Sequence, residues 1–241
     1  MTKIRVRFTK HGAIRYIGHL DVMRYFQKAI RRAGINVAYS GGFSPHQIMT
    51  FAAPLGVGLE SDGEYMDLGL EDTAPDTAAI MNALNKASVP EIRILSVRIL
   101  PEDAGNAMAS VFASAYEITF YDEKKALCPD KNTMQWLLDK CSLLESMIYH
   151  KETKKTSRDI DLKSFIYSLY LKDDDEDKPT VCMTINSSSS DSIKPGFVME
   201  YLCSLEDIKL PDNSLMITRL DMYTQSDSGD LVSLGDIGVT S

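Results

Sequence analysis

Hydrophobic and polar positions change period along the chain, and each change predicts a different element. Ile4, Val6 and Phe8 alternate with cations, which is the period-two pattern of a half-buried strand. Between residues 19 and 33 the apolar positions recur every three or four residues, which is the pattern of an amphipathic helix. Gly34 follows directly, as glycine often does where a helix ends. The chain is therefore predicted to open with a strand and a helix.

The remainder of the first hundred residues predicts extended segments and one more helix. Extended segments are expected at 37–40, 48–54, 64–70 and 92–100, and a helix at 77–87. In order this reads β, α, β, β, α, β, which is the ferredoxin-like arrangement.

The second half repeats the same order. Strands are expected at 115–121, 164–171, 180–186 and 215–223, and helices at 133–147 and 195–205. We therefore expect an α+β fold of two tandem ferredoxin-like (βαββαβ) units. The units are placed at 1–101 and 111–224, and the Gly-, Ser- and Asp-rich segment 225–241 is expected to be a flexible tail.

Composition narrows the class of protein. The chain has 241 residues, 44% hydrophobic and 25% charged, which suits a folded protein rather than a disordered one. No uncharged apolar run approaches the roughly 20 residues that a membrane-spanning helix needs. With no secretory signal region at the start, a cytoplasmic protein without a membrane partner is expected. The four cysteines form no C-x-x-C pair, so neither a metal site nor a cofactor is predicted.

Positive charge is concentrated near the start of the chain. The net charge is −8, but residues 1–60 carry nine Lys/Arg against two acids, leaving the rest of the chain strongly acidic. A local positive field attracts polyanions even on an acidic protein. The alternative is that carboxylates brought close by the fold neutralise these cations.

The segment 39–46, Tyr-Ser-Gly-Gly-Phe-Ser-Pro-His, is a predicted loop that could carry chemistry. Its glycines allow close approach of a ligand, and Tyr39 and Phe43 could stack on bases, as in many single-stranded RNA sites. The alternative is a turn whose aromatic rings fill the core. The residues expected to bind nucleic acid are Arg5, Arg7, Arg15, Arg24, Lys28, Arg31, Arg32, Tyr39, Ser40, Gly42, Phe43 and His46.

Catalysis is considered at the histidines, because imidazole titrates near neutral pH. His46, assisted by His19 or Tyr39, could cleave RNA without a metal, although a binding role is more common for such a histidine. At the start of the predicted helix, Gly18 and His19 could cradle a phosphate, or His19 could be an imperfect helix cap. Phosphate-loop, dinucleotide-binding, zinc-protease and nucleophile-elbow motifs are absent from the sequence, so intrinsic enzyme activity is not the favoured interpretation.

Several ordered motifs resemble one family, the radical-SAM-linked, DUF2344-type proteins of bacteria. These motifs are residues 15–21 (RYIGHLD), 29–33 (AIRRA), 39–46 (YSxGFxPH), 54–58 (PLxxG) and 61–65 (SxxEY). The resemblance is dense over residues 1–70 and sparse afterwards, where 159–162 (DIDL) also fits. Gly41 and Gln47 replace the glutamine and proline usual in that loop, which affects the expected ligand contacts.

The resemblance implies a partner, because members occur fused to or encoded beside a radical SAM protein. The leading hypothesis is an RNA-binding module that presents a tRNA or rRNA to this partner for modification or processing. A metal-independent endoribonuclease centred on His46 and a protein-interaction subunit are the alternatives. A further resemblance, in architecture alone, is to CRISPR repeat-processing endoribonucleases, and fold alone does not establish activity.

Overall fold

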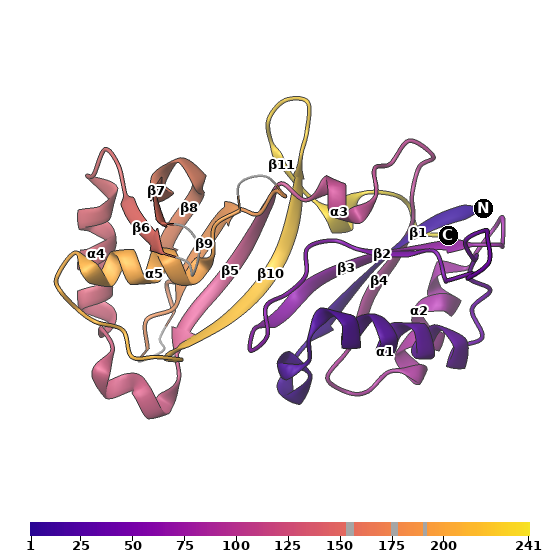
Figure 1. Cartoon of the computed structure of the whole chain (residues 1–241), viewed down its shortest axis with the longest axis horizontal. Helices are drawn as coiled ribbons and strands as arrows, with labels where there is room; N and C mark the ends of the chain where they lie inside the picture. Colours follow the sequence, from indigo (N-terminus) through magenta and orange to yellow (C-terminus); the bar gives the residue numbers. More distant parts are fainter. Residues whose placement is uncertain (153–156, 175–177, 190–191) are drawn as a thin grey trace. The chain divides into compact units, whose positions relative to one another are not determined.

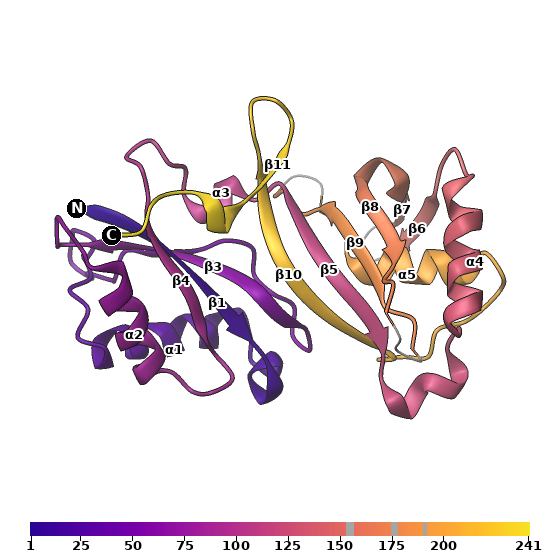
Figure 2. The ribbon, with the colours of Figure 1, turned by 180° about the vertical axis from the view of Figure 1, so that it is seen from behind.

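The computed structural model of the chain describes residues 1–152, 157–174, 178–189 and 192–241 (Figures 1 and 2). It has a mixed α+β fold with mostly antiparallel strand pairs. The chain divides into two compact units, unit 1 comprising 1–112 and 219–241 and unit 2 comprising 113–218. Within the described residues, no helix is long and apolar enough to cross a membrane.

The sheet of unit 1 is built around its first strand. β1 (Thr2–Lys10) pairs antiparallel with both β3 (Glu60–Leu70) and β4 (Ile94–Ile99). The strand order is β4-β1-β3-β10, where β10 is Leu215–Gln225 and enters unit 1 at residue 219. Two short strands complete the sheet: β2 (Met49–Phe51) on β3 and β11 (Leu231–Ser233) on β10. Residues 37–40, expected to be extended, form only isolated bridges.

Two helices cover one face of this sheet, α1 (His19–Arg32) and α2 (Thr77–Ala87). The predicted helix at 77–87 is confirmed, and the Asp76 carboxylate caps it by accepting a hydrogen bond from the Ala79 backbone N–H at 2.9 Å. The apolar side of β1 meets α1 directly, since the rings of Phe8 and Phe26 lie 4.6 Å apart, edge to face. Burying a side chain of this size contributes about 1.5–3 kcal/mol.

The opposite face of the unit 1 sheet is covered by segments that the sequence did not assign to it. The predicted linker contains the short helix α3 (Ala107–Ser110), and the predicted flexible tail contains β11 and a 3₁₀ turn at Leu234–Asp236. Leu234 is fully buried with Tyr65 and Met222 in a small apolar cluster. The structure thus corrects the prediction for 225–241: this segment is ordered and packed on unit 1, because burying its scattered apolar residues offsets the entropy of ordering it.

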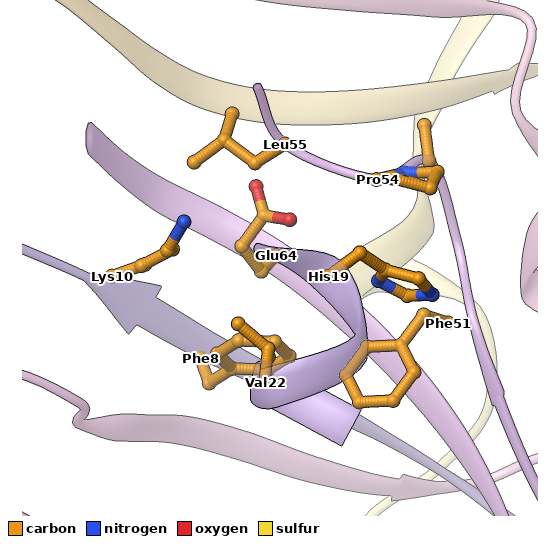
Figure 3. Close-up of a pocket in the computed structure, with 9 residues that line it drawn as sticks. Phe8, Lys10, His19, Val22, Phe51, Pro54, Leu55 and Glu64 are labelled. Atoms are coloured by element: carbon orange, nitrogen blue, oxygen red, sulfur yellow. The ribbon is translucent and has the colours of Figure 1, made fainter. Parts of the chain in front are cut away.

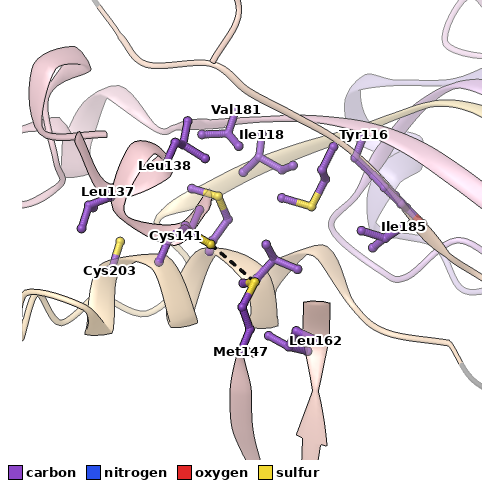
Figure 4. Packing of buried hydrophobic residues seen from close by; sticks show 14 of the residues in the cluster. Tyr116, Ile118, Leu137, Leu138, Cys141, Met147, Leu162, Val181, Ile185 and Cys203 are labelled. Atoms are coloured by element: carbon purple, nitrogen blue, oxygen red, sulfur yellow. Dashed lines mark hydrogen bonds between the residues drawn. The ribbon is translucent and has the colours of Figure 1, made fainter. Parts of the chain in front are cut away.

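Unit 2 repeats the layered plan with its own core. β5 (Ala113–Phe120) pairs with β9 (Val181–Asn186), which pairs with β8 (Ile166–Leu171). The helices α4 (Lys131–Ser142) and α5 (Pro195–Ser204) pack on one face of these strands (Figure 4). All four cysteines are free thiols. The Cys141 Sγ lies 3.4 Å from the Met147 Sδ in this core.

A separate hairpin in unit 2 was not predicted. It consists of β6 (Ile148–Glu152) and β7 (Ser157–Asp161), paired antiparallel. The expected helix at 133–147 stops at Ser142 instead, and Met147 directly precedes the hairpin. Short 3₁₀ turns occupy Gly12–Tyr16, Asp122–Leu127 and Leu162–Phe165.

Candidate functional site

The outer face of α1 carries the cations that the sequence singled out on this helix. Its apolar side is buried through Val22, Phe26, Ala29 and Ile30. At 100° per residue, Arg24, Lys28 and Arg31 then point away from the core, and all three are exposed. Arg24 pairs with Asp21 at 3.2 Å, but this ion pair is solvent-exposed and therefore weak. These three side chains are called the cation row below.

Two hydrogen bonds connect α1 to neighbouring segments on either side of the cation row. On one side, Arg32 donates to the Ala87 carbonyl at 2.9 Å, so this predicted cation faces α2. On the other side, the Gln47 side-chain amide donates to the Gln27 carbonyl at 3.5 Å. Gln47 closes the 39–47 loop, so this hydrogen bond joins the base of the loop to α1 at Gln27.

The 39–47 loop is a closed structure that projects an aromatic ring. Tyr39 and Gln47 form an isolated antiparallel bridge, and inside it the Ser40 N–H donates to the His46 carbonyl at 2.8 Å. Gly42 has a φ of +96°, a conformation that disfavours any residue with a Cβ. At the tip, Phe43 is fully exposed and Tyr39 half exposed. The rings are thus on the surface, and the alternative in which they fill the core does not hold for Phe43.

Ser40 and His46 are in direct side-chain contact. The Ser40 Oγ lies 2.8 Å from the His46 Nδ1 and accepts a hydrogen bond from the His46 backbone N–H at 3.1 Å. If the hydroxyl donates to Nδ1, the tautomer with a proton on Nε2 is favoured and that N–H faces solvent. His46 is exposed, so the pair can bind a base or phosphate, or exchange a proton with one.

The other histidine proposed for catalysis is placed elsewhere. The ring of His19 lies 5.3 Å from the Phe51 ring, edge to face, at the start of α1. It lines a small pocket with apolar side chains (Figure 3). The structure therefore groups Tyr39, Ser40, Gly42, Phe43 and His46 in one loop and puts His19 in a different site.

Three of the predicted phosphate-binding arginines are engaged inside unit 1, which corrects those predictions. Arg5 is buried and forms a two-point ion pair with Asp67, at 2.8 and 3.0 Å. Arg7 donates to the Leu220 carbonyl at 3.2 Å, and its guanidinium lies over the ring of Tyr65. Arg15 pairs with Glu60 at 3.0 Å. The arginines of the first strand were expected to bind nucleic acid, but residues beyond position 100 contact them on that face: Arg5 donates to the Gly105 carbonyl and Arg7 to the Leu220 carbonyl.

Sequence reasoning missed the groups that line the pocket beside His19. Lys10, at the end of β1, is almost fully buried, and Glu64 on β3 is held by Arg219. Lys10, Glu64 and Arg219 come from distant parts of the chain, and no spacing in the sequence indicates that they meet. Within the described residues, no cluster of three or more His, Cys, Asp or Glu side chains could hold a metal ion.

One family model matches the sequence. It is DUF2344, described as an uncharacterized protein conserved in bacteria, and the match spans residues 3–195. The chain belongs to this family. The matched range of this DUF2344 protein contains the cation row, the 39–47 loop and most of unit 2. No curated protein is similar enough in sequence to count as a match.

Solved structures share only a distant likeness with the DUF2344 chain. A chain of a crystal structure of a Cbf5–Nop10–Gar1 complex has a TM-score of 0.45 at 6% identity, covering 93% of this chain and 51% of that one. A chain of an archaeal box H/ACA sRNP Nop10–Cbf5 complex gives 0.42 at 6% identity, covering 90% and 46%. A putative glycine cleavage system transcriptional repressor gives 0.22 at 10% identity, covering 90% and 98%. The DUF2344 chain thus spans about half the length of the first two chains, and similarity this low carries no functional conclusion.

Proposed function

We propose that the chain is an RNA-binding module whose interface is the cation row of α1 together with the 39–47 loop. The observation that carries the proposal is the Gln47–Gln27 hydrogen bond, which joins the base of the loop that presents Phe43 to the helix that carries the three exposed cations. Cations supply phosphate contacts and aromatic rings supply base contacts, so the two kinds of group complement each other on one surface.

The geometry favours single-stranded or looped RNA over a duplex. Arg24 and Arg31 are seven residues apart, which is about 10 Å along a helix at 1.5 Å per residue. A row of that length follows a short stretch of backbone. Phe43 presents an open ring face, and stacking of one base on such a ring contributes about 1–3 kcal/mol. Bases are free to stack in this way only where RNA is unpaired.

The partner follows from the resemblance described above. We propose that the module presents a tRNA or rRNA to a radical SAM protein that modifies or processes it, in the cytoplasm. In this arrangement the partner supplies the reaction and this chain supplies affinity for the substrate. The interface on α1 and the loop leaves the acidic remainder of the chain available for contacts with the partner.

A tandem ferredoxin-like architecture is proposed as the framework. In unit 1 the order β4-β1-β3-β2 supports it, with α1 and α2 as the crossover helices. Over residues 113–225 the order β10-β5-β9-β8 supports it, with α4 and α5 in the same roles and the β6–β7 hairpin as an insertion. In this fold both helices lie on one sheet face, which puts the cation row of α1 on the outside.

Retention of cellular RNA on filters tests the proposal. The wild-type chain should retain RNA at low salt and lose much of it at moderate salt, because phosphate contacts release counterions. Phe43→Ala should weaken retention about fivefold or more, as expected for one lost stacking contact. Lys209→Gln, at an exposed lysine of unit 2, is the matched control and should have no effect. Absence of retention at low salt would remove the proposal.

A second candidate function is favoured by the Ser40–His46 contact. If the His46 Nδ1–H donates to the Ser40 hydroxyl, the unprotonated Nε2 could act as a general base at an RNA 2′-hydroxyl without a metal. This hypothesis predicts RNA cleavage in EDTA that is lost in His46→Ala while RNA binding persists. No cleavage by wild type under conditions in which RNA is bound would eliminate it.

A further inference from the structure

The β6–β7 hairpin of unit 2 packs against α5 with one face and is open to solvent on the other (Figure 1). Tyr149 and Ile160 are paired across the hairpin on the packed face. Ile160 is buried, and the ring of Tyr149 stacks on the ring of Phe197 with their centroids 4.8 Å apart. Successive side chains of a strand point to opposite faces, so the next pair, His150 and Asp159, faces outward, and both are exposed.

Three side chains on this outward face form one continuous hydrogen-bonded chain. The His150 Nδ1 lies 2.8 Å from a carboxylate oxygen of Asp159, its partner across the hairpin. Ser157 precedes Asp159 by two residues and so lies on the same face, diagonally opposite His150. Its Oγ lies 3.1 Å from the His150 Nε2. The imidazole thus contacts a carboxylate at one ring nitrogen and a serine hydroxyl at the other.

The carboxylate decides which nitrogen of the imidazole carries the proton. An ionised carboxylate only accepts hydrogen bonds, so the bond to Asp159 places the proton of a neutral His150 on Nδ1. The Nε2 then has a free lone pair and accepts the hydrogen bond of the Ser157 hydroxyl. In this order of contacts the imidazole can take the proton of the hydroxyl as it attacks an electrophile, while the carboxylate holds the ring in place.

We propose that Ser157, His150 and Asp159 form an acyl-transfer site that acts on activated carboxylic esters. A bond forms between the Ser157 Oγ and the acyl carbon, and the hydroxyl proton moves to the His150 Nε2. The bond from the acyl carbon to the leaving group breaks, and the leaving group departs with the electron pair and takes the proton from Nε2. Water then attacks the acyl-serine with His150 again as the base, which releases a carboxylic acid and restores the Ser157 hydroxyl. Asp159 is a positioning residue that fixes the tautomer of the ring.

The exposure of the three side chains sets the class of ester. The side chains of His150 and Asp159 are 62% and 66% exposed. Water therefore reaches the reacting carbonyl and hydrogen-bonds the oxyanion that forms, in place of fixed N–H donors, each of which typically contributes about 10²–10³ in rate. A site that relies on water in this way needs a leaving group that is already stable as an anion. Aryl esters and thioesters meet this condition, and the open face of the hairpin accepts an acyl donor of any size.

This inference does not rest on the proposed function. The three residues lie in unit 2, whereas the cation row and the 39–47 loop lie in unit 1. Acylation of Ser157 and retention of RNA are different measurements, so the failure of either proposal leaves the other to be judged by its own experiment.

Reaction of the full chain with p-nitrophenyl acetate, followed by peptide mass spectrometry, tests the proposal. Wild type should become acetylated at Ser157, and His150→Gln should slow this acetylation at least tenfold, because a general base contributes about 10²–10⁴ in rate. Ser164→Ala is the matched control and should react like wild type, because the exposed Ser164 hydroxyl donates to the Asp161 carbonyl at 2.8 Å. Wild-type acetylation that is no faster at Ser157 than at Ser164, or an unchanged rate in His150→Gln, would overturn the proposal.

NMR of the ring nitrogens of His150 tests the role of Asp159 and needs no variant for its main result. In wild type at a pH where the imidazole is neutral, the proton should be on Nδ1. Asp159→Asn should move a large share of it to Nε2 and slow the acetylation of Ser157 at least tenfold, because a ring in the wrong tautomer cannot accept the hydroxyl proton. A neutral His150 that carries its proton on Nε2 in wild type would contradict the proposal.

Discussion

The Ser40 hydroxyl lies 2.8 Å from the His46 imidazole and also accepts the His46 backbone N–H. One small side chain thus fixes both the ring and the backbone across the 39–47 loop. Since the loop is exposed, these bonds contribute little to global stability but hold Phe43 in one place for a ligand.

Replacing Ser40 should therefore affect RNA binding more than folding. Ser40→Ala removes about 1 kcal/mol of net hydrogen bonding, so RNA affinity should fall about fivefold. The unfolding midpoint should change by no more than a degree or two. Ser204→Ala, which removes an exposed serine hydroxyl of unit 2, is the control and should bind RNA like wild type. A large loss of stability in Ser40→Ala would contradict a purely local role.

The Arg5–Asp67 ion pair should act on stability alone. Asp67→Asn leaves the Arg5 guanidinium buried without its counter-charge, which typically costs about 3–5 kcal/mol. Asp67 also accepts the Ala107 backbone N–H at 2.7 Å, so α3 should loosen as well. Urea unfolding should register the loss, while RNA affinity of the remaining folded protein should be unchanged. Stronger RNA binding by this variant would show that Arg5, freed of its carboxylate, reaches a phosphate after all.

His11 should make part of the stability depend on pH. Its ring lies between Glu60, at 3.1 Å, and Asp62, at 2.8 Å. Burial by itself lowers the pKa of His11, but the hydrogen bonds and charges of these two carboxylates outweigh it and raise the pKa above its ordinary 6.5. Burial would raise the pKa of Glu60, yet its bonds to His11 and the Gly12 N–H lower it below 4.5.

The sign of the effect follows from these two shifts. Stability contributed by protonated His11 is complete below 6.5 and is lost as pH rises through its raised pKa. Stability contributed by ionised Glu60 is present above 4.5 and is lost as pH falls through its lowered pKa. The difference in unfolding free energy between wild type and His11→Gln should thus be largest near pH 5–6 and shrink by pH 8. A difference that does not vary with pH would contradict this account.

The C-terminal segment should behave as part of the unit 1 core. Leu234 is fully buried, so Leu234→Ala should destabilise the protein by about 2–5 kcal/mol. Residues 225–241 should also resist limited proteolysis under native conditions. A Val239→Ala variant, at an exposed position of the same segment, should unfold like wild type within about 0.5 kcal/mol. Rapid cleavage within this segment would contradict its packing on unit 1.

The periodic pattern of apolar residues predicted those elements whose buried face is made by residues close together in the sequence. The period of α1 and the capped helix 77–87 were readable because each buries one continuous apolar stripe. The arginines of β1 were predicted to bind nucleic acid because nothing near them in sequence indicates that residues beyond 100 cover that face. For the same reason the packing of residues 225–241 was not predicted, because their few apolar residues are scattered among Gly, Ser and Asp.

The candidate site likewise has one part that the sequence could predict and other parts that it could not. Exposure of Arg24, Lys28 and Arg31 follows from helical period alone and could be predicted. The position of the loop beside α1 depends on the Gln47–Gln27 contact, which no spacing rule gives. The pocket lined by Lys10 and Glu64 could not be predicted from the sequence, because Glu64 and its partner Arg219 lie on strands and are 155 residues apart in sequence.

The most direct test of the central claim is the salt dependence of RNA affinity for the wild type and for an Arg24→Gln/Lys28→Gln/Arg31→Gln variant. Each phosphate contact contributes about 0.7 to the slope of log affinity against log salt for a single strand. If the cation row binds RNA, the slope of the variant should be shallower by about 2 and its affinity at low salt much lower. An unchanged slope in a folded variant would mean that RNA, if bound, contacts another surface.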